Sequence, residues 1–354
     1  MDFAFSEEQE LLRGSAREFL AEQYPLERVG EVIDAPADEP GWAVQSWKQL
    51  ADLGWLDTEL GLLDHVVVFE ETGYGVLPAP LFSTLALALP AIERYAELRG
   101  AVAAGDLRLT LVWAETGRPQ GLRDAVSSCI SASADGAVTG HAVLVPDAAA
   151  VDAFVVATTD GLRLVPAGSA GAVTITPRAT SDRSRRMADV VFTGAPSTLL
   201  ADASEAPAVL ESIERRALVL AAAEALGVAR RAVDIAVQHA STREQFGRPI
   251  GSYQAVSHQI VDAYAATELA RSLTYWAAWT VAEADDLTDA ACSAAKASAS
   301  EAAVHACERA IQVCGGIGFT WEHVLHRLYK RALWLNAFAG QGSEHRARIA
   351  DSVL

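Results

Sequence analysis

Apolar residues recur at helical spacing through most of the first hundred residues. Ser6, followed by Glu7 and Glu8, predicts a helix start, because a hydroxyl and carboxylates favour the free N–H groups found there. The apolar pattern that follows ends at Pro25. Three further stretches have the same period and predict a mostly helical N-terminal part: residues 47–55, 62–75 and 85–98.

From about residue 106 the pattern changes to short β-branched and alternating runs. The first, Leu107–Trp113, reads as a strand, and dipeptides such as Asp135-Gly136 and Asp160-Gly161 indicate turns between the later ones. Many short strands at regular spacing are typical of a compact β-barrel or sandwich. The other predicted strands are residues 142–145, 153–157, 162–165, 173–176 and 189–192.

After about residue 203 the helical period returns and persists. Short loops between long Ala- and Leu-rich segments favour antiparallel neighbours in a four-helix bundle. The predicted helices are residues 206–240, 254–284, 287–313 and 322–338. The sequence therefore predicts an α+β multi-domain protein with three parts: an N-terminal helical domain (1–104), a middle β domain (105–202) and a C-terminal helical bundle (203–354).

Composition and charge narrow the classes of function. The 354 residues have a formal net charge of −18, which argues against nucleic acid or an anionic membrane as the main partner. No signal peptide and no convincing membrane span is visible. The four cysteines form no CxxC pair, so a reduced, cytoplasmic location is expected.

The stretch from Arg243 to Gln254 interrupts the helices with two glycines and a proline, so the chain must turn there. Arg243 suits a pyrophosphate, because a planar guanidinium can meet two phosphate oxygens at once. Phe246 is suited to cover an aromatic ring system, and Gln254 to hydrogen-bond a polar edge. The alternative is an ordinary helix–turn–helix corner with a solvated arginine.

A second glycine-rich corner runs from Gln312 to His323. The adjacent glycines Gly315 and Gly316 would let backbone approach a ligand closely. A plain helix stop is the alternative. The corner is not a GxGxxG turn after a strand, so a Rossmann dinucleotide site is not supported.

The order of helical, β and helical parts, with RxxFG followed by GGxGF, resembles the acyl-CoA dehydrogenase family over essentially the whole chain. The resemblance implies FAD as cofactor, a dimer of dimers, α,β-dehydrogenation of an acyl-CoA by a carboxylate base, and an electron-transfer flavoprotein as usual acceptor. It also implies FAD contacts, in a neighbouring subunit's site, at these positions: Arg243, Phe246, Gln254, Gln312, Gly315 and Gly316.

The two positions where this family carries its base hold alanines, Ala339 and Ala217, and an alanine cannot accept a proton. Glu214 lies nearly one helical turn before Ala217 and is a weak candidate base. The alternative for Glu214 is a surface partner for the neighbouring arginines. Two other carboxylates are weaker candidates still: Glu224 and Glu344.

The middle domain departs from the family at the flavin face as well. The family threonine that touches the isoalloxazine corresponds to Ala114, and the segment that offers a hydroxyl near flavin N5 falls at residues 144–147, with neither Trp nor hydroxyl. The chain thus resembles the base-less subunit of α2β2 acyl-CoA dehydrogenases that act on sterol side chains or other bulky CoA thioesters. Its expected partner is a homologous, base-bearing subunit.

Two other classes of function remain open: a base-less, flavin monooxygenase-type relative and a non-redox structural paralogue. His323 and His326 could in principle ligate a metal, although helix surface is the favoured interpretation and no metal site is predicted. Arg183, Arg185 and Arg186 could meet CoA phosphates, a partner's acidic surface or only solvent. Cys314 is expected to be a small buried residue.

Overall fold

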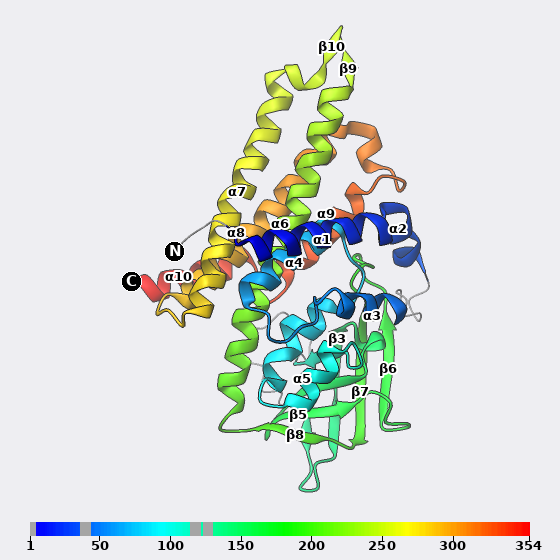
Figure 1. Ribbon diagram of the computed structural model, residues 1–354, viewed down its shortest axis with the longest axis vertical. Coiled ribbons are helices and arrows are strands. Elements are labelled where there is room, and N and C mark those ends of the chain that lie inside the picture. The colour runs from blue at the N-terminus through cyan, green and yellow to red at the C-terminus, as the bar shows by residue number, and fades with distance from the viewer. Residues whose placement is uncertain (1–4, 36–43, 114–121, 123–129) are drawn as a thin grey trace. The chain divides into compact units, whose positions relative to one another are not determined.

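The computed structural model describes residues 5–35, 44–113, 122 and 130–354. The chain divides into two compact units (Figure 1). Unit 1 contains Met1–Gly30, Gly61–Leu77 and Leu218–Leu354; unit 2 contains Glu31–Leu60 and Pro78–Ala217. Each unit thus combines segments that are distant in sequence. The three continuous domains expected from the sequence remain a prediction.

Unit 1 is helical. Its longest helix, α6, begins at Ala206 in unit 2 and continues through unit 1 to Thr242. α7 packs against α8, and α8 packs against α9 and α10. The elements are α1 (Glu7–Gln23), α4 (Leu62–Gly75), α6 (Ala206–Thr242), β9 (Glu244–Gln245), β10 (Arg248–Pro249), α7 (Gln254–Ala282), α8 (Thr288–Cys314), α9 (Leu325–Ala337) and α10 (Gly342–Val353). The four predicted C-terminal helices are confirmed, and α10 was not predicted.

The N-terminal helix begins as expected. The Ser6 hydroxyl accepts a hydrogen bond from the Gln9 backbone N–H at 3.1 Å, and the Gln9 side chain accepts one from the Ser6 N–H at 3.2 Å. These two bonds form a capping box. The helix predicted over residues 62–75 is α4, and α3 (Val44–Asp52) lies at the second predicted helix. α2 (Leu26–Asp34), directly after Pro25, was missed.

The helix predicted over residues 85–98 is wrong. The chain instead forms a π-helical segment, Phe82–Ala88, then a 3-10 turn, Leu89–Ile92, and only afterwards α5 (Ala96–Ala103). Pro90 explains the break, because proline has no N–H to continue the α-helical hydrogen bonds.

Unit 2 contains two four-stranded sheets, ordered β1-β4-β5-β8 and β2-β3-β7-β6. β1 pairs with β4 in parallel, and the other described pairs within these sheets are antiparallel. The Phe154 and Phe192 rings meet edge to face, 5.9 Å apart, in the buried core. The strands are β1 (Leu109–Val112), β2 (Ser131–Ala132), β3 (Val138–Pro146), β4 (Ala153–Thr158), β5 (Gly161–Pro166), β6 (Val173–Arg178), β7 (Met187–Ala195) and β8 (Thr198–Asp202).

Two glycines let α4 and α6 cross at backbone contact inside unit 1. A Cβ atom added at Gly227 would lie 1.9 Å from the Glu70 carbonyl oxygen, and one at Gly73 would lie 2.0 Å from the Glu224 carbonyl oxygen. Any other residue would force the two helices apart. The crossing fixes α6 against the N-terminal helices.

Candidate cofactor-binding site

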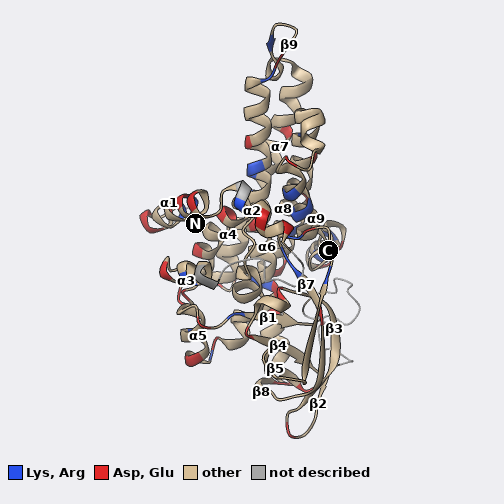
Figure 2. Cartoon of the chain, turned by 90° about the vertical axis from the view of Figure 1, so that its right-hand side faces the viewer, with Lys and Arg blue, Asp and Glu red and all other residues tan. Residues whose placement is uncertain are grey.

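The first glycine-containing corner is a β-hairpin at the tip of α6 and α7. β9 and β10 pair antiparallel, with Gln245 opposite Arg248, and the two residues between them form the turn. Basic side chains lie at this tip (Figure 2). Arg243 is exposed, and its guanidinium forms no hydrogen bond or ion pair with any described residue, whereas its backbone bonds His239 and Ile250. Gln254 is also exposed, in the first turn of α7.

Phe246 occupies a strained backbone position. Its φ is +54° and that of Gly247 is +79°, so both central turn residues have the positive φ that a type I′ hairpin requires. Asn or Asp is usual at the first of these positions, and a side chain as large as Phe pays a steric cost there. The ring is nevertheless 92% exposed. A strained, exposed aromatic residue indicates a contact surface.

The second corner follows the end of α8 as a 3-10 turn, Gly315–Phe319. Gly315 and Gly316 are exposed, and a Cβ at either would meet no atom within 4 Å. The backbone here is therefore open to a ligand. Gln312 is exposed on the last turn of α8. Within the described residues, no hydrogen bond, ion pair or ring contact joins this corner to the hairpin.

The hairpin and the glycine-rich corner both suit the pyrophosphate and adenosine half of an FAD molecule that is bound across a subunit boundary. An unpaired guanidinium suits a pyrophosphate, and an open glycine backbone permits close approach. All six predicted contact residues lie in unit 1, and all six are exposed: Arg243, Phe246, Gln254, Gln312, Gly315 and Gly316.

The two positions at which the sequence predicts the family base are buried alanines. Ala217 is fully buried and Ala339 is nearly so. The alternative expectation for Glu214, a surface partner of the neighbouring arginines, is wrong in its burial. Glu214 lies on α6 and is only 1% exposed. Of its arginine neighbours, Arg215 donates to Glu211 and Arg216 donates to the Leu85 carbonyl. The role of Glu214 as a candidate base stays a prediction.

The loop that carries Ala339 is held by a buried lysine that sequence reasoning missed. Lys296, on α8, donates hydrogen bonds to the carbonyls of Asn336 at 3.4 Å and Gly340 at 3.1 Å. Burial lowers the pKa of Lys296 to about 8. His345 lies beside Gly340 and is fully buried. In the sequence, Lys296 stands out as a charged residue within an Ala-rich helical stretch, and this could have indicated a buried role for it.

The buried His345 should make stability fall in mild acid. Burial, with help from Lys296 and Arg348, lowers its pKa from 6.5 to about 3, so the folded protein keeps the ring neutral. The unfolded chain takes up a proton below pH 6.5, and stability present above that pH is lost as the pH falls toward 3. Between pH 7 and 5 the loss is about 2 kcal/mol.

Urea unfolding at pH 7 and pH 5 measures this loss. The variant His345→Leu should lose about 2 kcal/mol less than the parent between the two values. His141→Gln, which removes an exposed histidine, is the control. An equal pH dependence in the parent and His345→Leu would contradict the expectation.

Of the two segments predicted to face the flavin, only residues 144–147 are among the described residues. Ala114 lies outside the described residues. At the second expected segment, Pro146 is buried and Asp147 accepts a hydrogen bond from the Ser83 hydroxyl at 2.6 Å. That carboxylate is therefore engaged within unit 2.

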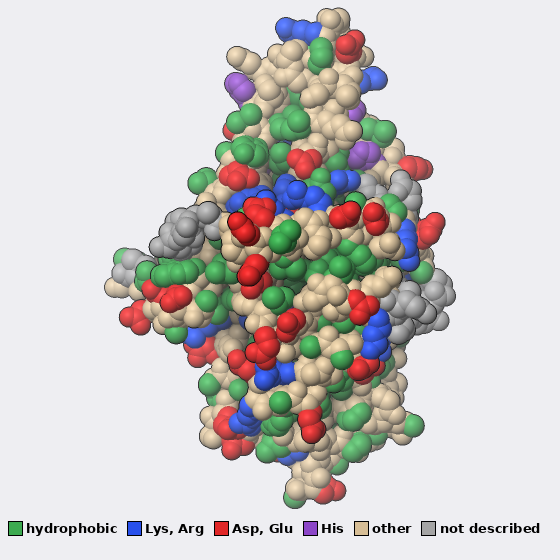
Figure 3. All heavy atoms as spheres, viewed as in Figure 1, with side chains coloured by type: hydrophobic (Ala, Val, Ile, Leu, Met, Phe, Trp, Pro, Cys, Tyr) green, Lys and Arg blue, Asp and Glu red, His purple; other side chains and the backbone are tan. Residues whose placement is uncertain are grey.

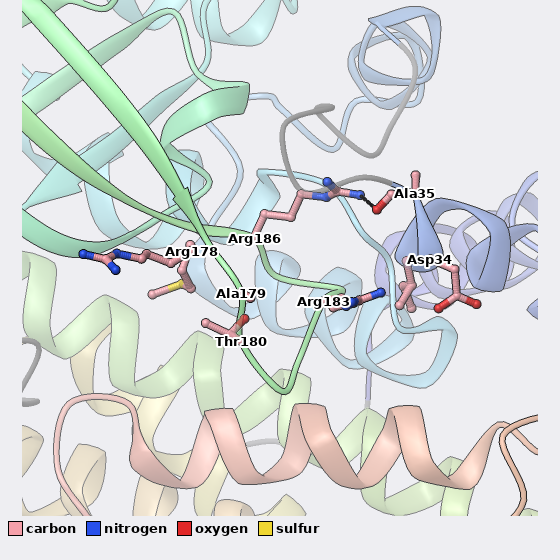
Figure 4. A pocket seen from close by; sticks show the side chains of 9 residues that line it. Asp34, Ala35, Arg178, Ala179, Thr180, Arg183 and Arg186 are labelled. Carbon is pink, nitrogen blue, oxygen red and sulfur yellow. Dashed lines mark hydrogen bonds between the residues drawn. The ribbon is translucent and has the colours of Figure 1, made fainter.

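A basic cavity of about 230 Å³ lies within unit 2 (Figure 4). Arg183 and Arg186 line it, facing Asp34 and Ala35 respectively, and Arg186 donates to the Ala35 carbonyl at 3.3 Å. Arg178 also lines it but is paired with Asp189. The third arginine of the predicted patch, Arg185, is buried over the Phe82 ring instead. The arginines of the predicted patch therefore contact other parts of unit 2 and are not a solvated loop alone.

No group of three or more His, Cys, Asp or Glu that could hold a metal occurs within the described ranges. His326 bonds the Trp321 carbonyl and Lys330. Cys314 is buried, and burial raises its pKa, which does not suit a nucleophile. Of the described helices, none is long and apolar enough to cross a bilayer.

Large hydrophobic side chains lie exposed along the two long helices below the hairpin (Figure 3). Leu269 on α7 is 68% exposed. Exposed apolar residues gathered on neighbouring helices are typical of protein interfaces. The others are Val237, Val261 and Tyr264.

Comparison with known proteins defines the family. Residues 209–354 match the acyl-CoA dehydrogenase C-terminal domain. The chain is 30% identical to the acyl-CoA dehydrogenase IpdE2 of Mycobacterium tuberculosis, over 92% of this chain and 91% of that one. It is 32% identical to the acyl-CoA dehydrogenase FadE34 of the same organism over 81% of its length, and spans 37% of that protein.

Solved structures agree. A variant of the Tcur3481–Tcur3483 steroid ACAD is similar with a TM-score of 0.85 and 30% identity, covering 98% of this chain and 97% of that one. The ChsE4–ChsE5 complex from Mycobacterium tuberculosis has a TM-score of 0.86 and 25% identity, covering 100% and 99%. The chain belongs to the acyl-CoA dehydrogenase family. The family fold is confirmed, and its cofactor is FAD.

Proposed function

We propose that this chain is the base-less subunit of an FAD-dependent acyl-CoA dehydrogenase and completes the FAD site of a homologous, base-bearing partner in an α2β2 assembly. One observation carries the proposal. The six residues expected to contact a neighbour's FAD lie exposed, while both base positions hold buried alanines, Ala217 and Ala339.

The similar proteins support this assembly. One similar structure is the ChsE4–ChsE5 complex, and the other is the Tcur3481–Tcur3483 steroid ACAD. The exposed apolar residues of α6 and α7 offer this chain a surface for such a partner. The substrate class that follows is a CoA thioester of a sterol side chain or another bulky acyl group.

Each part of the chemistry then has a defined source. FAD, when bound, takes up the hydride released from the β-carbon of the acyl group. Arg243 would pair with its pyrophosphate, and the backbone at Gly315 and Gly316 would approach the same half of the cofactor. Removal of the α-proton needs a carboxylate from the partner. An electron-transfer flavoprotein is the expected acceptor.

Flavin content and mass test the proposal together. The chain is purified alone and with its homologous partner, and FAD per chain is measured by absorbance beside mass by light scattering. We expect no FAD on the chain alone and about half an equivalent per chain in the mixed tetramer. A full equivalent in a homotetramer of this chain would overturn the base-less assignment and make Glu214→Gln the next variant.

In the mixed tetramer, Arg243→Gln should weaken FAD binding by about one to two orders of magnitude, because charge-assisted hydrogen bonds are lost. Arg346→Gln is the matched control, since Arg346 is exposed and pairs with Glu301. Equal FAD affinity in the two variants would place the pyrophosphate elsewhere.

The two alternative classes give different results in the same experiment. A base-less flavin monooxygenase-type relative would hold FAD on this chain alone. A non-redox structural paralogue would hold none in either preparation.

A further inference from the structure

A second cavity, of about 270 Å³, lies within unit 1 and has no role in the function proposed above. Its size is near the lower end of ligand pockets, roughly 300 Å³. The mainly apolar part of its lining comes from α1 and the residues after it: Leu20, Ala21, Tyr24 and Pro25. The rest of its lining comes from α1, α4 and α6 and is mainly polar: Arg17, Glu71, Tyr74, Gly75 and Arg231.

The carboxylates near the cavity are already engaged. Glu71 is 1% exposed and accepts hydrogen bonds from Arg17 at 2.8 Å and Arg230 at 2.6 Å. Burial alone would raise the pKa of Glu71, but these two hydrogen bonds bring it below its usual value, so the group stays charged and paired. Its neighbour Glu70 pairs with Arg230 and Arg271.

Arg231 is different. Its Nη1 donates to the Tyr74 hydroxyl at 2.9 Å, and that hydroxyl in turn donates to Asp234 at 3.0 Å. Among the described residues, its Nη2 has no hydrogen-bond partner, and neither does its Nε, which is buried. No carboxylate among the described residues forms an ion pair with Arg231. A guanidinium with unused donors at the wall of a cavity is an unsatisfied anion-binding group.

The guanidinium is also fixed in place. The Tyr74 ring is flanked by two guanidinium groups, with the Arg230 Cζ 4.5 Å and the Arg231 Cζ 4.7 Å from its centroid. These cation–π contacts and the hydrogen bond to the phenol hold Arg231 in one orientation. A pre-ordered donor loses little entropy when an anion binds.

From this geometry we propose that the cavity binds a small carboxylate with a compact hydrocarbon body. The carboxylate would take the unused donors of Arg231, because a guanidinium matches two carboxylate oxygens. The hydrocarbon would lie against Leu20, Ala21 and Pro25. The inference is independent of the FAD assignment, since none of the residues that line the cavity is among the six predicted FAD contacts.

Hexanoate is the probe, and its dissociation constant is measured by titration calorimetry with the full chain. We expect hexanoate to bind more tightly than its neutral isostere hexanamide, and more tightly than acetate or inorganic phosphate, which lack the hydrocarbon. Arg231→Gln should weaken hexanoate at least about tenfold and leave hexanamide unchanged. The control Arg346→Gln, at an exposed ion pair elsewhere in unit 1, should bind hexanoate as the parent does.

A second variant tests the site independently, in case Arg231→Gln fails to fold. Ala21→Leu fills the apolar side without touching the guanidinium and should also weaken hexanoate. Equal hexanoate binding by the parent, Arg231→Gln and Ala21→Leu would overturn the proposal. Phosphate binding as tightly as hexanoate would overturn the carboxylate-and-hydrocarbon assignment. No hexanoate binding by the correctly folded parent would overturn the site itself, with no consequence for the flavin measurement.

Discussion

Replacing Arg331 with methionine is expected to destabilise unit 1 by about 3–5 kcal/mol. Arg331 is fully buried and forms an ion pair with Glu224, whose side chain is only 3% exposed. Removing the guanidinium leaves a carboxylate buried without that partner, and the cost of an uncompensated buried charge is large. Urea unfolding followed by circular dichroism measures the loss.

Two further variants show that the loss comes from the broken pair. The double variant Glu224→Leu with Arg331→Met should recover most of the stability, because replacing a whole buried pair with apolar side chains is often neutral or favourable. Arg346→Met breaks the exposed pair with Glu301 and should cost about 0–1 kcal/mol. If Arg331→Met cost no more than Arg346→Met, the buried pair would not stabilise the fold.

Gly227→Ala is expected to be the second most damaging change, at about 1–3 kcal/mol or more. The new Cβ would meet the Glu70 carbonyl oxygen at 1.9 Å and the Tyr74 nitrogen at 2.5 Å. Both are backbone atoms, so no side chain can turn aside and the two helices must separate. Thermal unfolding of the full chain measures the effect.

Gly100→Ala is the matched control. It lies in α5, and a Cβ there would meet nothing within 4 Å, so it should stabilise by about 0.5–1 kcal/mol. Gly73→Ala would place a Cβ at the same crossing from the α4 side. The losses of stability caused by Gly73→Ala and Gly227→Ala should therefore not be additive in the double variant. A neutral Gly227→Ala would mean that the crossing can widen freely.

The regular parts of the fold could be predicted because their local signals agree with their packing. Ser6 caps α1 as its sequence indicates, and the glycines after residue 72 mark the end of α4. Local signals failed where one residue outweighed the pattern: Pro90 broke a helix that the apolar period favoured. α2 was missed because Pro25 was taken as a stop, although proline also suits a helix start.

The sequence could predict the exposed residues of the candidate site, and it could not predict the role of the buried ones. The residue types at Arg243 and Gly315 carry their chemistry in the sequence itself. Burial does not appear in a sequence, so Glu214 was assigned to the surface as its alternative role, and the structure places it in the interior. Lys296 and Arg231 were missed for the same reason, since their significance lies in the neighbours that surround them.

The discontinuous make-up of unit 1 has a consequence for the chain while it is being made. Two of its segments end at Gly30 and Leu77, and the third begins only at Leu218. A ribosome adding roughly 5–20 residues per second needs on the order of ten seconds to make the segment between them. During that interval the face of α4 that α6 crosses at Gly73 has no α6 to cover it. Nascent-chain chaperones therefore have a defined time in which to act on this protein.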